Sequence, residues 1–226
     1  MKNQWSIHVV TQSVALGKWD KLATLINGKK VAHSFLIATN EDNDVVWRMD
    51  GLAYDRKGNL IAECSSGLKA YMSYIADSLA LTSVFERVAN AVGLGKHIPR
   101  LEIICTNGDE WPIQDDAVAR TVATGSKEHI TNLWRTATQA ADAIRSRNLP
   151  YIPSNIYRGG QNCHSVTASL LKSIGVCVNA NDFEHYAVPG ISNTLLDDSE
   201  NATRPPLPAP TPAPTEQSFE QDFVPA

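Results

Sequence analysis

Cys163 is the residue of this sequence whose setting most favours covalent chemistry. It follows the polar segment 158–162 and begins a stretch with apolar residues at helical spacing, namely Val166, Leu170, Leu171 and Ile174. At a helix N-terminus, unpaired backbone N–H groups and the helix dipole stabilise a thiolate. We therefore expect Cys163 to be a nucleophile with a lowered pKa, and we expect the polar first turn to keep its sulfur from being buried.

The residues around Cys163 could bind the rest of a reacting group. Gln161 and Asn162 carry side-chain amides, and the backbone N–H of Cys163 points out of the first helical turn. Such donors can hold the oxyanion that forms when a thiolate attacks a carbonyl. His164 is adjacent to the nucleophile, and we expect it to line the cleft or to help bind substrate.

A cysteine nucleophile needs a general base, and histidine is the usual one. The chain has six histidines, and His33 stands out because it opens the apolar strand expected over 34–39. His185, in a polar segment after the last helix, is the alternative base. His8 alternates within an expected strand and is interpreted as structural.

A hairpin supplies the third group of the site. The polar residues 40–44 form a turn between the strands 34–39 and 45–49. With Glu41 and Asp42 at the centre of that turn, Thr39 faces Asp44 and His33 faces Asp50. A carboxylate opposite an imidazole can orient it and support its protonated form. The alternative interpretation is that Asp50 and the following glycine form a turn that ends the strand.

The remaining cysteines do not suggest chemistry. No two cysteines have the spacing of a zinc or redox motif, so we expect no metal and no other cofactor. We interpret Cys64, Cys105 and Cys177 as small buried apolar side chains. A reducing compartment argues against disulfides.

The spacing of apolar and turn residues predicts an α+β domain over residues 1–195 and a proline-rich tail over 196–226. A PxxP ligand around Pro205 is an alternative interpretation of the tail, which we expect to be a disordered spacer. The expected strands cover 5–11, 34–39, 45–49, 60–64 and 101–106. The expected helices cover 68–92, 115–123, 127–147 (capped by Ser126) and 163–174.

Composition and charge exclude some classes of function. Twenty basic and 24 acidic residues give a net charge of −4, which does not favour nucleic acid as a partner. No run of about 18 apolar residues is present, so we expect no membrane span. The first ten residues lack the apolar core of a signal peptide. We expect synthesis in the cytoplasm, with export only by a specialised secretion system.

The blocks 32–36 (Ala-His-Ser-Phe-Leu), Asp50-Gly51 and 162–165 (Asn-Cys-His-Ser) resemble those of circularly permuted papain-like hydrolases of the NlpC/P60 superfamily. In such permuted members the histidine precedes the cysteine, as it does here. The resemblance covers roughly residues 5–178. It implies an antiparallel sheet packed against helices, with the nucleophile at a helix N-terminus. His33 and Cys163 carry over by motif, and Asp50 carries over less directly.

The resemblance implies a thiol hydrolase that cleaves amide bonds, with peptides of peptidoglycan stems as the expected substrate. Some permuted relatives resemble injected toxins, so a secretion machinery and an immunity protein are expected partners of an antibacterial effector. The alternatives are a deamidase, a thioesterase or an acyltransferase with the same Cys-His site, or a binding module without catalysis. The residues after Cys163 do not match the Asn-Cys-Glu-His block of permuted acyltransferases.

Overall fold

The fold is known from a computed structural model, and several regions predicted from the sequence lie outside the part that it describes. These regions are the helix over 68–92, most of the strand 60–64, the alternative base His185, Cys64 and the tail from 197 onward. The described residues are 4–14, 24, 29–54, 58, 60, 100–108, 113–151, 161–183, 186–188 and 190–196.

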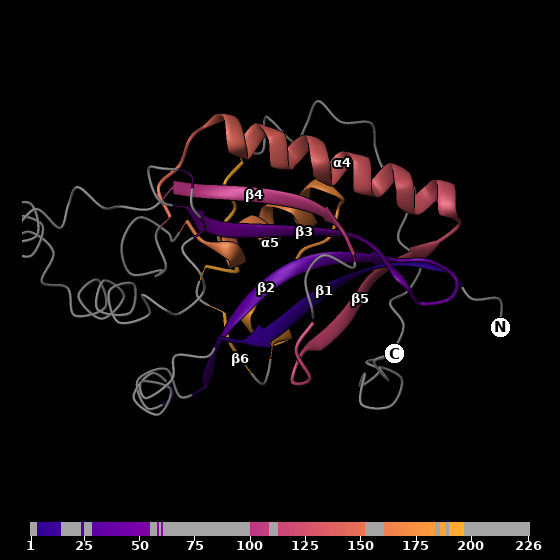
Figure 1. The fold of residues 1–226 in the computed structure, drawn as a ribbon, viewed down its shortest axis with the longest axis horizontal. Coiled ribbons are helices and arrows are strands. Elements are labelled where there is room, and N and C mark those ends of the chain that lie inside the picture. Colours follow the sequence, from indigo (N-terminus) through magenta and orange to yellow (C-terminus); the bar gives the residue numbers. More distant parts are fainter. Residues whose placement is uncertain are drawn as a thin grey trace, which may run out of the picture.

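A twisted antiparallel sheet forms the centre of the described structure (Figure 1). Its strands pair in the order β4-β3-β2-β1-β5, and the short β6 pairs with β2 in parallel. The strand bounds are β1 Trp5–Ser13, β2 Lys30–Thr39, β3 Val45–Tyr54, β4 Arg100–Asn107, β5 Val118–Gly125 and β6 Tyr186–Ala187.

Two α-helices, α4 (Lys127–Ser146) and α5 (Cys163–Ser173), pack against each other and against one face of this sheet. Ser126 caps α4 by accepting a hydrogen bond from the N–H of His129, as the sequence predicts. Gly175 follows α5 with a φ of 80°, a conformation that suits a glycine after a helix. Neither helix has an apolar stretch suited to crossing a bilayer, within the described residues.

The α+β class predicted from the sequence is confirmed. Within the sheet, side chains of β2 alternate between two faces, and both faces are buried. Leu36 and Ala38 point into the main core beneath α4 and α5, whereas Phe35 and Ile37 join a smaller cluster on the opposite face. Side chains alternate across a strand, so His33 lies on the face of Phe35. Both faces of β2 are therefore covered.

The short helix predicted over 115–123 is wrong, because this segment contributes to β5. β5 pairs with β1 from Val118 to Gly125. Its valines and threonines suit a pleated strand, and pairing with β1 decides the conformation of a segment whose helical signal is weak. The burial predicted for Cys105 and Cys177 is also wrong, since both side chains are exposed.

The sheet opens between β2 and β3. These strands pair only from Phe35–Asp50 to Thr39–Val45, although β2 continues back to Lys30 and β3 continues on to Tyr54. Beyond the opening, β2 stays paired with β1 and β3 stays paired with β4. Figure 1 shows β3 and β4 diverging from β2 and β1, with α5 behind.

Candidate active site

Cys163 is the first residue of α5, at the place where the sheet opens. Asn162 is the N-cap, and its Oδ1 accepts hydrogen bonds from the N–H groups of His164 and Ser165. The Ser165 hydroxyl in turn accepts from the N–H of Asn162, which completes a capping box. This cap fixes where the helix begins and therefore where the Cys163 side chain lies.

Gly51 allows α5 to approach β3 closely. A Cβ atom at this position would lie 2.9 Å from Cβ and Cγ2 of Val166 and 3.2 Å from the Cα of Cys163. Carbon atoms this close repel each other, so a larger residue would push the helix away from the strand. β3 runs through Asp50 and Gly51 without a turn, so the alternative interpretation of these residues as a strand-ending turn is wrong.

His33 and Asp50 meet on the face of the sheet opposite the main core. Nε2 of His33 lies 2.5 Å from Oδ1 of Asp50, and both side chains are buried. Because Nε2 is engaged by the carboxylate, Nδ1 is the ring nitrogen that remains for the thiol. The structure thus pairs the predicted base with the predicted orienting carboxylate.

The predicted register that led to this pair is nevertheless wrong. Asp50 faces Phe35 rather than His33, and Thr39 faces Val45 rather than Asp44. The loop is longer than a two-residue turn, since the N–H of Asn40 donates to the carbonyl of Asp44. In addition, a bulge shifts the pairing of β2 with β3 between Ala38 and Thr39, just before the loop. The resulting shift of two residues leaves Asp50 on the same face, so it reaches His33 diagonally.

The electrostatics of the site favour a thiolate–imidazolium pair. Burial raises the pKa of Cys163, but the charges of His164 and His33, and hydrogen bonds from both, bring this pKa well below its usual range. Burial lowers the pKa of His33, but the charges of Asp50 and Cys163 raise it well above the usual range. Charge pairing therefore outweighs desolvation at both groups.

The expectation that the sulfur escapes burial is wrong, because Cys163 is only 4 % exposed. The polar cap and the neighbouring sheet cover the first turn of α5. A thiol buried among apolar groups alone would stay neutral. Here two imidazoles face it, so burial makes the charge pairing more effective rather than quenching the nucleophile.

His164 is a second imidazole beside the sulfur and is itself held by hydroxyl groups. Ser34 donates its hydroxyl proton to Thr167, and Thr167 donates to the backbone carbonyl of Ser34. Nδ1 of His164 lies 2.8 Å from the Ser34 hydroxyl oxygen and forms a hydrogen bond with it. Nε2 of His164 is left for Cys163. With 2 % exposure, His164 contacts the nucleophile from inside the protein.

The predicted oxyanion donors have different contacts. Asn162 uses its Oδ1 to cap α5. Contacts within the described residues occupy the N–H groups of His164, Ser165 and Val166, which leaves the N–H of Cys163 as the donor in this turn.

Gln161 carries a buried Oε1 that has no hydrogen-bond partner in the described part of the chain. Buried polar atoms are rarely left unpaired. This acceptor, two residues before the nucleophile, is available to a donor group of a bound substrate.

Arg48 and Phe35 complete the site, and sequence analysis missed both. Nε and Nη2 of Arg48 donate to Oδ2 of Asp50 over 2.9 and 2.6 Å. The guanidinium lies 3.7 Å from the centre of the Phe35 ring, which also stacks against His33. Their alternation with Asp50 and His33 along the two strands is the sequence signal that could have found them.

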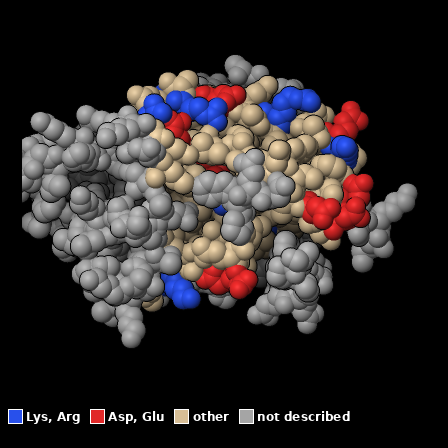
Figure 2. Space-filling model, viewed as in Figure 1, with Lys and Arg blue, Asp and Glu red and all other residues tan. Residues whose placement is uncertain are grey.

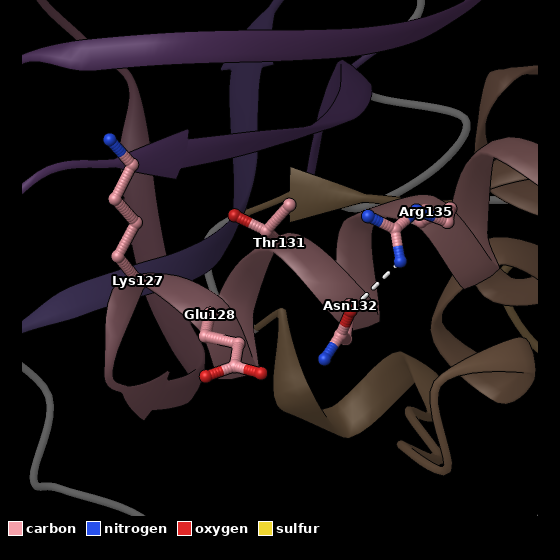
Figure 3. A pocket seen from close by; sticks show the side chains of 5 residues that line it. All are labelled: Lys127, Glu128, Thr131, Asn132 and Arg135. Atoms are coloured by element: carbon pink, nitrogen blue, oxygen red, sulfur yellow. Dashed lines mark hydrogen bonds between the residues drawn. The ribbon is translucent and has the colours of Figure 1, made fainter.

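Other parts of the described surface do not resemble this site. Figure 2 shows acidic and basic side chains interspersed on the face in view. A depression on the outer side of α4 is lined by polar residues, and none of the residues discussed above contributes to it (Figure 3). Within the described residues, no cluster of three or more His, Cys, Asp or Glu side chains could hold a metal ion. His8 is hydrogen-bonded to Thr39 and to Thr121.

Comparison with known proteins identifies no relative. No protein-family model, no curated protein sequence and no solved structure matches the chain. The geometry of Cys163, His33 and Asp50 is therefore the main evidence for the function of this protein.

Proposed function

We propose that this protein is a cysteine hydrolase of the circularly permuted papain-like kind, which cleaves amide bonds. One observation carries the proposal: a cysteine at a capped helix N-terminus faces an imidazole. A buried carboxylate holds this imidazole, with 2.5 Å between His33 Nε2 and Asp50 Oδ1. A nucleophile, a base and an orienting group in this order form the constellation used for acyl transfer. A binding module without catalysis has no need to lower the pKa of a buried thiol.

The first half of the reaction forms an acyl-enzyme. The Cys163 thiolate attacks the carbonyl carbon, and the negative charge moves to the carbonyl oxygen. The N–H of Cys163, with the side-chain NH2 group of Gln161, holds this oxyanion. Protonated His33 then gives its Nδ1 proton to the leaving nitrogen as the C–N bond breaks, and a thioester remains on Cys163.

The second half regenerates the enzyme. Neutral His33 takes a proton from water, and the resulting hydroxide attacks the thioester carbonyl. The C–S bond breaks, the acid product leaves, and Cys163 returns as a thiolate beside protonated His33. Asp50 stabilises the imidazolium of the free enzyme, which is present before the first half and again after the second. The net reaction adds one water across the amide bond.

We propose peptide bonds of peptidoglycan stem peptides as the substrate, with delivery as an antibacterial effector and neutralisation by an immunity protein. These assignments follow from the resemblance of the His33, Asp50 and Cys163 blocks to permuted NlpC/P60 hydrolases.

The test is digestion of purified peptidoglycan by the wild type, by Cys163→Ala and by Cys105→Ala, with products identified by mass spectrometry. Cys105 is exposed and lies outside the site, so it is the matched control. We expect stem-peptide fragments from the wild type and from Cys105→Ala, and none from Cys163→Ala. If the wild type releases no fragments while Cys163 stays highly reactive, the substrate assignment is wrong and protein or ester substrates take its place.

A further inference from the structure

We infer that Arg48 is a positioning residue of the active site, which fixes Asp50 so that one carboxylate oxygen is reserved for His33. The inference rests on the proposed thiol chemistry and extends its machinery beyond the three residues of the triad. Arg48 donates two hydrogen bonds to Asp50. It acts through Asp50.

The contacts divide the Asp50 carboxylate between two cations. Oδ2 accepts two hydrogen bonds from Arg48, at 2.9 and 2.6 Å, while Oδ1 accepts from His33 at 2.5 Å. Arg48 and Asp50 are each 4 % exposed, so neither exchanges its partner for bulk water. A carboxylate held by two donors on one oxygen cannot rotate freely, and its other oxygen keeps a fixed direction.

Phe35 links Arg48 and His33 by packing. Its ring centre lies 3.7 Å from the guanidinium carbon and 5.7 Å from the centre of the imidazole, which stacks on it. A planar guanidinium suits this arrangement, because it can lie over an aromatic ring while donating in its own plane. A lysine ammonium supplies the charge without the paired donors.

The charges of the site also require Arg48. The thiolate and Asp50 are negative, and the charges that favour the thiolate come from His164 and protonated His33. Burial raises the pKa of Asp50, but the charges of His33 and then of Arg48, with hydrogen bonds from both, bring this pKa below its usual value. Without Arg48, the buried Asp50 carboxylate loses one of its two cationic partners, and its negative charge opposes a second negative charge on Cys163 more strongly.

Other groups around the pair leave this role to Arg48. On β1, Gln12 lies opposite His33 and is uncharged, and burial lowers the pKa of His8 to about 4, so His8 is neutral near pH 7. On β4, Glu102 is paired with Arg100. On α5, His164 faces the sulfur and Ser34 rather than Asp50.

The test is the pH dependence of alkylation of Cys163 by iodoacetamide, which needs no substrate. The acid limb of the profile is the pH range over which the alkylation rate rises as the Cys163 thiol ionises. Arg48→Gln should move this limb up by about one pH unit, because the thiolate loses a nearby positive charge. Arg48→Lys should move it by less than half as much. Arg135→Gln, on the exposed face of α4, should leave the limb unchanged.

A second pair of variants separates a positioning role of Arg48, which needs Asp50, from a direct effect of its charge on Cys163. In an Asp50→Asn background, Arg48→Gln should shift the limb by much less, since the carboxylate through which Arg48 acts is gone. The inference is overturned if folded Arg48→Gln, checked by circular dichroism, keeps the wild-type limb, or if the shift is unchanged in the Asp50→Asn background.

If Arg48→Gln does not fold, Arg48→Lys decides: an upward shift supports the inference and an unchanged limb overturns it. Failure of the proposed function looks different. In that case, the wild type itself shows no acid limb below the ordinary thiol range, or its reactive Cys163 releases no product from peptidoglycan.

Discussion

At the scale of single residues, the site depends on opposing effects on one buried sulfur. Desolvation favours the neutral thiol, whereas two imidazoles favour the thiolate. Asp50 decides the balance at His33, because its negative charge makes the protonated ring the stable form. The ion pair therefore needs Asp50 even though Asp50 does not touch the sulfur.

Replacing Asp50 with Asn tests this dependence. The pKa of His33 should fall, because the ring loses the negative charge that supports its protonated form. A raised histidine pKa keeps the imidazolium present up to that pKa, so the basic limb of the kcat/KM profile against pH should move to lower pH. The rate at the optimum should fall on the order of 100-fold. An unchanged basic limb in the folded variant contradicts the role of Asp50.

The chemistry at these residues was predictable in part. Cys163 and His33 followed from their positions at the starts of an expected helix and strand, and the structure brings them together with Asp50. The register that suggested Asp50 was wrong by two residues, and only the two-residue periodicity of a strand kept the pair on one face. Ser34 and Thr167 were missed because long-range contacts between strand and helix leave little local pattern.

At the scale of elements, the site exists because the sheet opens where α5 begins. β2 contributes His33, β3 contributes Asp50 and Gly51, and the capped first turn of α5 contributes Cys163. No single element carries the site. The opening between β2 and β3 could not be predicted, because each strand looks continuous in the sequence and only the pairing partners change.

Gly51→Ala tests the close approach of α5 to β3. The added methyl carbon would lie 2.9 Å from Val166 and 3.2 Å from the Cα of Cys163, so the helix must shift. We expect a loss of about 1–3 kcal/mol in the free energy of unfolding, measured by chemical denaturation.

The alkylation rate of Cys163 in Gly51→Ala should also fall, because the displaced thiol loses its imidazole contacts. Gly58→Ala is a suitable comparison for the contact itself, since nothing lies within 4 Å of its added carbon, although its φ of 79° adds backbone strain. Wild-type alkylation in a folded Gly51→Ala protein argues against the tight contact.

At the scale of the whole molecule, every residue assigned to the site lies between residues 33 and 167, whereas the proline-rich composition begins after residue 196. The division of the chain into 1–195 and 196–226 stays a prediction. The α+β class followed from the sequence because apolar periodicity marks the main strands and helices. The strand conformation of β5, within the segment predicted as a helix over 115–123, did not follow from the sequence, since its pairing with β1 is non-local.

Removing the tail tests whether it serves catalysis. A chain ending at residue 200 keeps every described element and should retain the wild-type Tm within a few degrees and the wild-type alkylation rate of Cys163. Differential scanning calorimetry and timed alkylation measure the two quantities. Loss of Cys163 reactivity in a folded, shortened chain contradicts a spacer role for the tail.

The most direct test of the central claim compares the cysteines of the native wild-type protein near pH 6. Cys163 is 4 % exposed, whereas Cys105 and Cys177 are exposed. Partial desolvation raises the pKa of Cys105, and Arg145 offsets this only in part. Accessibility alone therefore predicts that Cys163 reacts last. The account predicts that iodoacetamide, followed by peptide mass spectrometry, labels Cys163 at least about 10-fold faster than the other two, because the thiolate is the reactive form. Faster labelling of Cys105 and Cys177, with Cys163 protected until unfolding, would contradict it.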